Sequence, residues 1–429
     1  MAMPVVTARK RLTLTEFGPG VLANLSPEEI ASLEASAEGW GRRLGLPSAP
    51  LVVTTFEGTT RVAARHVTGV LRVGGIDFEI VPKFLGQRPD SESSWKDALW
   101  RILSLVDESA PSDELTSALP TENLSLVDLL ADVFVSGFRR GTARGLPRTY
   151  REDRSLEPVV RGSIDLSRMG DWIARPWQVP CVVDSLTEDT DAAQLIRWAA
   201  NELSRAVSSS RRSQNLRDIV HSMPTVSSRP PSVAAATAIR LGPQYQALQQ
   251  VVGLAALLLE GRGLEHATGP GEMGGFLWNS DEIYERFLFY LCQRAARQLS
   301  YRAEKRSLRM GEPLTPGTRP LTTTPDVLIR QPGSAVVAVI DAKYKVFGRT
   351  PEASDSYQIV MAAHATGCRW VALAYPDSAQ EAAKSWSVSS RLGGGDVALT
   401  ALPLDLLLAS TRVGTTSLVA ELATWIKQG

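Results

Sequence analysis

Short runs of β-branched residues in the first quarter of the chain predict a small β domain. Between positions 51 and 84 the sequence reads LVVTTFEGTTRVAARHVTGVLRVGGIDFEIVPKF, in which glycines such as the Gly74-Gly75 pair separate the apolar runs. Short alternating runs broken by glycine are typical of antiparallel hairpins. We therefore expect residues 1–90 to form a β-rich N-terminal domain.

The hydrophobic period then changes from that of strands to that of helices. The segments WKDALWRILSLV, from Trp95, and LVDLLADVFVSGF, from Leu126, repeat apolar residues at helical spacing. Serine- and proline-rich stretches punctuate the chain further on. This pattern predicts a helical middle region over residues 91–270.

The last third of the chain mixes both periods. NSDEIYERFLFYLCQRAARQL, from Asn279, begins with a capping pattern and predicts a helix. Strand-like segments follow near 301–310, 322–329 and 335–346, and then come the helix SDSYQIVMAAHATG and the strand RWVALAYP. We expect residues 271–429 to form a domain with α-β-β-β-α-β order, so the whole chain is predicted to be an α+β multidomain protein.

Two aspartates flank a predicted turn in this last domain. Residues 331–334 form a Pro-Gly turn, and the midpoint between Asp326 and Asp341 lies within it. A simple hairpin therefore places the two side chains opposite each other, with Cβ atoms about 4.5 to 5.5 Å apart. Two carboxylates at that range repel each other unless one takes up a proton or a cation lies between them. A divalent metal ion is the obvious candidate.

The strand that carries the second aspartate changes character along its length. One face is apolar throughout, whereas the other begins with valines and then continues into Asp341, Lys343 and Lys345. Ordinary surface charges on a half-exposed strand would also give an Asp-x-Lys pattern. The matched Asp326 and the change from buried to charged positions favour a cleft instead. Carboxylates suit Mg²⁺ or Mn²⁺, and a nearby lysine can offset charge on a phosphate, so the pattern indicates phosphodiester hydrolysis.

Composition excludes several other classes of function. Lys plus Arg and Asp plus Glu both total 46, so no overall charge attracts the chain to nucleic acid. Neither a P-loop nor a dinucleotide-binding glycine motif is present, and the three cysteines and four histidines lack the spacing of a zinc site. No apolar run is long enough for a bilayer, and the N-terminus lacks the apolar core of a signal peptide, so we expect a cytoplasmic protein without membrane contact.

One segment of the middle region is locally basic. FRRGTARGLPRTYREDR holds six arginines, among them Arg139, Arg140, Arg144 and Arg148. A charge run of this kind is compatible with a solvated, flexible connection. The interspersed aromatic and glycine residues make contact with a phosphate or docking of a partner a fair competing interpretation.

The motif in the last domain resembles that of a known superfamily. PDVLI followed by VIDAKYK is similar to the signature of the PD-(D/E)XK nucleases, which assigns Asp326, Asp341 and Lys343 to a catalytic site. In that fold an acid on the first helix often completes the metal site, which here would be Glu285; a solvent-facing helix acid is an equally good reading. The resemblance also implies that Gln358 orients DNA or the site, although Ala362 occupies the position where related nucleases often have tyrosine.

The resemblance extends beyond the nuclease motif. GVLRVGGIDFEIVPKF, GFRRGTARGLPRTYRE, VVRGSIDLSR and DEIYERFL look like segments of the McrC subunits of the McrBC-type modified-cytosine restriction systems. This likeness implies a Mg²⁺-dependent endonuclease for modified double-stranded DNA that works with an AAA+ GTPase ring subunit similar to McrB. It also implies that the N-terminal half binds the ring and stimulates GTP hydrolysis, so that GTP is used only through the partner. Lys83 and the four arginines named above are the candidate contacts.

Two alternatives remain open from the sequence. A stand-alone PD-(D/E)XK nuclease of repair or recombination would cut DNA without a nucleotide-hydrolysing partner. A non-catalytic DNA-binding scaffold would usually have lost one of the acids or the lysine, and all three are present.

Overall fold

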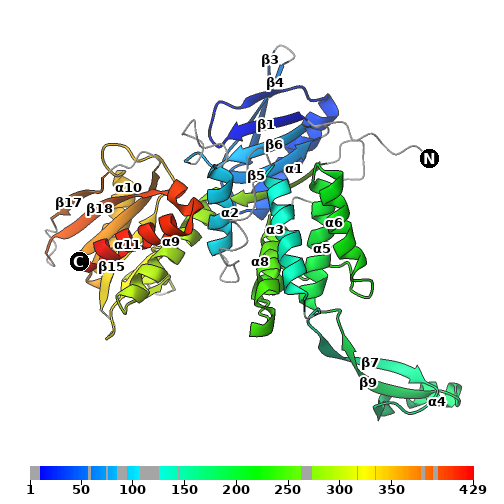
Figure 1. Cartoon of the computed structure of the whole chain (residues 1–429). Helices are drawn as coiled ribbons and strands as arrows, with labels where there is room; N and C mark the ends of the chain where they lie inside the picture. Colours follow the sequence, from blue (N-terminus) through cyan, green and yellow to red (C-terminus); the bar gives the residue numbers. More distant parts are fainter. Residues whose placement is uncertain are drawn as a thin grey trace. The chain divides into compact units, whose positions relative to one another are not determined.

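The computed structural model describes most of the chain. The described residues are 10–56, 59–73, 76–84, 94–106, 125–143, 145–261, 273–315, 317–333, 335–377, 382–389 and 395–429. They form a mixed α+β protein with two compact units, Met1–Leu126 together with Gly261–Gly429, and Val127–Glu260 (Figure 1). The mixed α+β class is therefore confirmed. None of the helices in the described part of the chain is both long and apolar enough to cross a membrane.

The N-terminal part of the first unit contains the predicted hairpins. A four-stranded sheet has the order β1-β6-β5-β10, and a three-stranded sheet has the order β2-β4-β3. The bounds are β1 Lys10–Thr15, β2 Val21–Ala23, α1 Pro27–Arg43, β3 Leu51–Phe56, β4 Thr59–Ala64, β5 Val67–Val73, β6 Ile76–Val81 and β10 Met273–Asn279. The buried faces of the sheets and of α1 share one hydrophobic core, which includes Leu33 and Phe78.

Strand β10 joins this sheet from far along the chain. Its residues pair antiparallel with β5, from Met273 opposite Val73 to Asn279 opposite Val67. The sheet is thus completed by a segment that the predicted boundary after residue 270 places in the C-terminal domain. The three predicted domains, 1–90, 91–270 and 271–429, stay a prediction.

Gly69 is required where β5 and β10 meet. Its φ is +134°, and an ideal Cβ atom at this position would lie 2.0 Å from the carbonyl oxygen of Phe276. Gly69→Ala is expected to lower the free energy of unfolding by about 2 kcal/mol or more, because both the backbone conformation and the close approach exclude a side chain. Urea denaturation measures this change. Gly348→Ala is the matched control, since nothing lies closer than 3.9 Å to its Cβ position, and an equal loss in both variants would contradict the argument.

The C-terminal part of the first unit is a six-stranded sheet with helices on both faces. Its order is β11-β14-β15-β16-β18-β17, and β12 and β13 form a separate hairpin. The bounds are α2 Ser94–Val106, α9 Ser280–Gln298, β11 Arg302–Glu304, β12 Leu308–Gly311, β13 Leu321–Thr323, β14 Val327–Arg330, β15 Val336–Ala342, α10 Ala353–Thr366, β16 Trp370–Asp377, β17 Lys384–Val388, β18 Val397–Asp405, η3 Leu406–Ser410 and α11 Arg412–Gln428. From α9 to β16, the described part of the chain runs helix, five strands, helix, strand, because β12 and β13 lie between β11 and β14. The predicted PD-(D/E)XK core with α-β-β-β-α-β order stays a prediction.

Central strand β15 is buried on both faces. Helix α10 covers one face of the sheet, where Ile359 packs with Val339 and Val371 in a common core. Helix α9 packs against the sheet as well, and α11 packs on α9. Ile340 and Ala338, on the alternate positions of β15, have no exposed surface. The buried part of the strand runs from Ala338 to Asp341, and the strand ends one residue later, at the partly buried Ala342.

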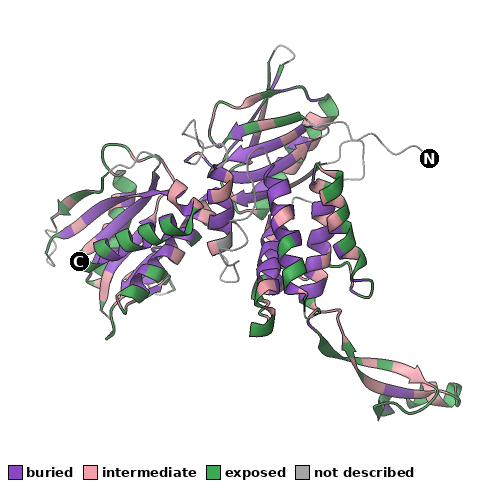
Figure 2. Ribbon diagram, in the orientation of Figure 1, coloured by how far each residue is buried: buried purple, intermediate pink, exposed green. Residues whose placement is uncertain are grey.

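The second unit combines a group of helices with a β arm. Its bounds are α3 Leu126–Gly141, β7 Thr149–Glu157, β8 Ser163–Ile164, η1 Leu166–Arg168, α4 Met169–Ala174, β9 Val179–Thr187, α5 Asp191–Ala206, α6 Ser210–His221, α7 Val233–Ala238, η2 Pro243–Tyr245 and α8 Gln246–Glu260. Strands β7 and β9 pair antiparallel along their whole length and lead away from the helices to α4 (Figure 1). The last six residues of the basic segment, 149–154, thus belong to strand β7, and its first four end helix α3. Figure 2 shows buried surfaces on the helices and mainly exposed or intermediate ones on the arm.

Candidate functional site

The hairpin of β14 and β15 brings the two predicted aspartates together. Val327 pairs with Ile340 and Leu328 with Val339, so the next position outward sets Asp326 opposite Asp341. A register shift lies nearer the turn, after Ile329, and does not alter the pairing at this end. The predicted opposition of the two aspartates is confirmed.

Both carboxylates are buried and already engaged. Asp326 accepts hydrogen bonds from the main-chain N–H of Ala342 (2.9 Å) and from Nζ of Lys305 (3.0 Å). Asp341 Oδ2 lies 2.5 Å from Nζ of Lys343. Burial raises the pKa of the Asp341 carboxyl, and although Lys343 opposes this rise, the neighbouring Asp326 adds to it. The pair therefore holds its negative charge only with a cation close by.

Lys343 lies at the centre of the polar groups. Besides Asp341, its Nζ lies 3.6 Å from Oδ1 of Asp355, and it donates to Oε1 of Gln358 over 3.4 Å. Burial alone lowers the pKa of Lys343, but the Asp341 and Asp355 carboxylates raise it above its ordinary value. The ammonium thus stays charged, and Gln358, predicted from the resemblance, does lie beside it.

Asp355 is a site residue that the sequence argument missed. It belongs to the first turn of α10 and is buried, and its Oδ2 lies 2.5 Å from Nζ of Lys345. The N-cap of this helix is Glu352, whose carboxylate also contacts Lys345 at 2.7 Å. Two lysines of the strand end therefore converge on one buried acid of the following helix.

Lys305 is the second residue that the sequence argument missed. Its Nζ bridges Asp326 (3.0 Å) and Glu285 of α9 (3.3 Å), so the predicted helix acid does face the site. Burial raises the pKa of Glu285, as does the nearby Asp326. A pocket of about 380 Å³ opens here, lined by Lys305, Asp326 and one face of α9. Because β11 runs antiparallel to β14, Lys305, the residue after β11, lies close to Asp326. This proximity follows from the pairing of the two strands and leaves no motif in the sequence.

The donors fit a hydrated divalent ion better than a fully enclosed one. In the described part of the chain, no three His, Cys, Asp or Glu side chains are grouped closely enough to hold a metal. Mg²⁺ usually keeps several waters and is bound through one or two carboxylates and the phosphates of a substrate. The facing carboxylates of Asp326 and Asp341 satisfy that requirement, with Glu285 at the edge.

Lys83 is enclosed within the first unit. Its Nζ donates to the main-chain oxygen of Tyr344 over 2.7 Å and lies 4.4 Å from the centre of that residue's ring. These contacts occupy the ammonium inside the chain. The structure therefore gives no support to the predicted docking role of Lys83.

The predicted arginine contacts differ in their surroundings. Arg139 donates to Asn215 over 3.1 Å, and Arg148 forms an ion pair with Glu188 at 2.7 Å. Arg140 is exposed at the end of α3, and Arg144 lies outside the described residues. Further along β7, two more arginines contact acids of the arm, Arg151 with Asp153 and Asp189, and Arg154 with Glu152 and Asp165. Acidic residues, several of them from outside the basic segment, therefore offset much of the positive charge of its arginines in the folded chain.

Comparison with known proteins identifies the family. The family described as McrBC 5-methylcytosine restriction system component matches residues 62–376, more than half of the chain. A solved half-complex of Thermococcus gammatolerans McrB AAA+ hexamers with bound McrC contains a similar chain, with a TM-score of 0.63, 16% identity, and coverage of 98% of this chain and 100% of that one. A second structure, the McrBC complex of the same organism, matches with a TM-score of 0.49 and 16% identity over 67% of this chain and 88% of that one. No curated protein matches the sequence. The chain therefore belongs to the family of McrBC 5-methylcytosine restriction system components, as the resemblance in its sequence predicts.

Proposed function

We propose that this chain is the Mg²⁺-dependent DNA endonuclease subunit of a GTP-driven, modification-dependent restriction complex. The observation that carries the proposal is the pairing of Asp326 with Asp341 on neighbouring strands, with Lys343 in contact with the second acid. Membership of the McrBC family supports it independently. Modified double-stranded DNA as the substrate, and the cytoplasm as the compartment, are parts of the same proposal.

The proposed chemistry divides between the carboxylates and the lysines. Asp326 and Asp341 would hold the metal, with Glu285 as a further ligand or a base for its water. A bound Mg²⁺ ion polarises a phosphoryl oxygen and activates water. Lys305 and Lys343 now neutralise the carboxylates. With a cation held by the carboxylates, both ammonium groups would be free to contact the scissile phosphate, and Gln358 and Asp355 would orient Lys343.

The proposed partner is an AAA+ GTPase ring similar to McrB. The similar chain from Thermococcus gammatolerans comes from an assembly of McrB AAA+ hexamers with bound McrC. The arm of the second unit is suited to such docking, because it exposes large apolar side chains: Leu166 is 74%, Ile173 82% and Trp177 70% exposed. Contiguous exposed apolar patches often mark protein interfaces, and the proposal places these three side chains in one. Arg140, Arg144 and Arg148 remain candidate contacts of the same unit.

Cleavage of plasmid DNA by the purified chain tests the function. Plasmid with or without methylated cytosine is incubated with Mg²⁺, with the chain alone and with its ring partner and GTP. We expect double-strand cleavage only for the modified plasmid in the complete mixture. Cleavage by the chain alone would favour a stand-alone nuclease, and no cleavage in any mixture would favour a non-catalytic scaffold.

Metal binding gives a test that does not depend on the partner. Asp326→Asn is expected to weaken binding of Mn²⁺, used as a spectroscopic substitute for Mg²⁺, by about tenfold or more, which corresponds to about 1.4 kcal/mol. The amide removes one anionic ligand but can still accept the hydrogen bond from Ala342. Titration followed by electron paramagnetic resonance measures free Mn²⁺. Asp396→Asn is the control because Asp396 is exposed and bonded to Ser387; equal affinity in wild type and Asp326→Asn would contradict the ligand assignment.

A further inference from the structure

Three polar residues, the buried Glu16 and the half-buried Lys83 and Tyr344, form a cluster beside the candidate site. Glu16 follows β1 and is 1% exposed, Lys83 follows β6, and Tyr344 comes directly after Lys343. The Tyr344 hydroxyl donates to Oε2 of Glu16 over 2.8 Å, and the same oxygen accepts the main-chain N–H of Lys83 at 3.2 Å. The N-terminal sheet thus contacts the nuclease strand through side chains more than 250 positions apart in the sequence.

The cluster fixes Tyr344 at two points. Glu16 holds the end of the side chain, while Lys83 donates to the main-chain oxygen over 2.7 Å. The ammonium also lies over three aromatic rings, at 4.6 Å from Phe17, 5.0 Å from Phe84 and 4.4 Å from Tyr344. A lysine surrounded by rings has few other positions available to it.

The main chain at Lys343 makes one hydrogen bond to the neighbouring strand and one within the segment itself. Lys343 donates its main-chain N–H to Ala374 of β16 (2.8 Å), and Lys345 donates its own to the oxygen of Lys343 (2.8 Å). Tyr344 lies between them and has its contacts to Glu16 and Lys83. The direction in which the Lys343 side chain leaves the backbone therefore depends on where Tyr344 is held.

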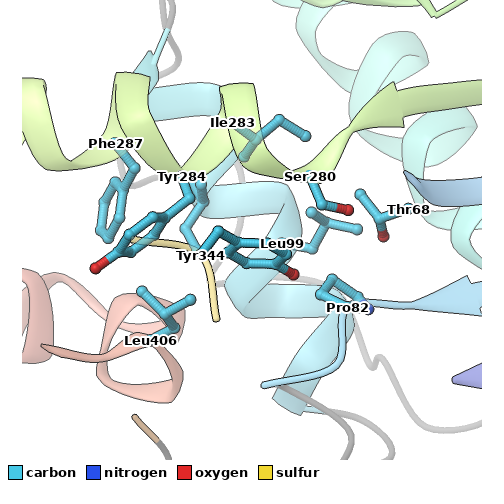
Figure 3. Close-up of a pocket in the computed structure, with 10 residues that line it drawn as sticks. Thr68, Pro82, Leu99, Ser280, Ile283, Tyr284, Phe287, Tyr344 and Leu406 are labelled. Carbon is cyan, nitrogen blue, oxygen red and sulfur yellow. The ribbon is translucent and has the colours of Figure 1, made fainter. Parts of the chain in front are cut away.

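Packing alone does not hold the tyrosine ring. A cavity of about 20 Å³, room for about one water, lies beside it and is lined mainly by apolar side chains, among them Leu99, Ile283 and Leu406 (Figure 3). The ring is close to Tyr284 at 5.7 Å between centres. The ring also packs edge-on against Phe84, at 5.1 Å between centres, so the polar contacts act together with aromatic packing to fix its position.

We propose that Glu16 and Lys83 are positioning residues that set the place of Lys343 through Tyr344. The inference rests on the proposed nuclease function, since it assigns these residues to the same site. Under this proposal, the residues that follow β1 and β6 hold Tyr344, which comes directly after Lys343. A displacement of the ends of these two strands would therefore move Lys343.

Stability gives no sufficient reason for a charged pair at this position. Burial raises the pKa of Glu16 and lowers that of Lys83, which shows that both charges are costly here. Apolar side chains of similar volume often stabilise such a site equally well or better. A specific geometry, by contrast, requires directional donors and acceptors.

Three substitutions test the positioning role in the assembled complex. Tyr344→Phe removes the hydrogen bond to Glu16, and Lys83→Met removes the ammonium with its hydrogen bond and its contacts to the rings. Both are expected to lower kcat for DNA cleavage by about 10 to 100-fold while KM for DNA changes less than twofold, because misplacement of a catalytic group costs rate rather than binding. Glu16→Gln keeps an oxygen that accepts from Tyr344 and is expected to retain most of the activity. Tyr284→Phe is the matched control, since its hydroxyl has no hydrogen-bond partner among the described residues.

Hydrogen exchange of the peptide that spans residues 339–347 gives a readout that needs no cleavage. Exchange is expected to be several-fold faster in Tyr344→Phe and Lys83→Met than in wild type, Glu16→Gln and Tyr284→Phe, with thermal unfolding confirming that each variant is folded. Unchanged exchange, or faster exchange with unchanged kcat, overturns the inference. A wild-type complex that does not cut DNA overturns the proposed function instead, and the exchange data then decide alone whether Glu16 and Lys83 hold the segment.

Discussion

Asp341→Ala and Lys343→Ala are each expected to reduce DNA cleavage by the assembled complex at least about 10² to 10³-fold, the size of effect typical for removal of one group that stabilises a transition state. Asp341 is one of the two facing acids, and Lys343 is the ammonium held against it. Neither variant should unfold the protein. Burial raises the pKa of Asp341, and an acid whose pKa is raised by folding lowers stability as pH rises towards neutral.

The effect of the raised Asp341 pKa on stability can be measured together with cleavage. At pH 7 the unfolding free energy of Asp341→Ala is expected to equal or exceed that of wild type, because the variant lacks a buried carboxylate. In Lys343→Ala the paired acids lose a cation, and uptake of one proton restores neutrality.

Cleavage assays with two surface variants complete the design. Lys427→Ala and Asp396→Asn change exposed residues of the same kinds elsewhere in the C-terminal part, and both should cut DNA at the wild-type rate. Full activity in Asp341→Ala or in Lys343→Ala would remove the basis for the active-site assignment.

The central pair of the site could be predicted because it depends on local structure. A hairpin relates Asp326 and Asp341 through one turn, so their opposition follows from counting residues. Lys305 and Asp355 could not be found in this way. Their approach depends on how β11 pairs with β14 and on how α10 packs on the sheet, and neither relation leaves a periodic signal in the sequence.

In the fold too, local hairpins could be predicted from the sequence, whereas pairing between distant strands could not. The hairpins between residues 51 and 84 follow from glycines and alternation, and the structure contains them. The pairing of β10 with β5 joins residues about 200 positions apart. Its sequence, MGGFLWN, carries no mark of its partner strand. The charge of Lys83 suggests a docking contact, but its ammonium lies over the aromatic rings of Phe17 and Tyr344, which the sequence does not reveal.

The double variant Ile173→Asp with Trp177→Ala is expected to reduce stimulation of the ring's GTP hydrolysis at least tenfold at limiting concentrations of this chain. Both side chains are exposed on the arm of the second unit, and buried aromatic anchors commonly contribute 2 kcal/mol or more to an interface. Asp341→Ala should stimulate as wild type does, because it alters a different compact unit. The chain alone should neither bind nor hydrolyse GTP, since its sequence lacks a P-loop.

Full-length variants are better suited to this test than a fragment that ends near residue 270. Such a fragment would lack β10 and would expose the edge of β5. Val413→Asp is the matched control, because Val413 is 81% exposed, close to the 82% of Ile173, and lies in the first unit. GTP turnover of the isolated ring is measured with each protein added. Loss of stimulation in Val413→Asp to the same degree would show a general effect of surface charge, and no stimulation by the wild-type chain would contradict the partner assignment and favour the stand-alone nuclease.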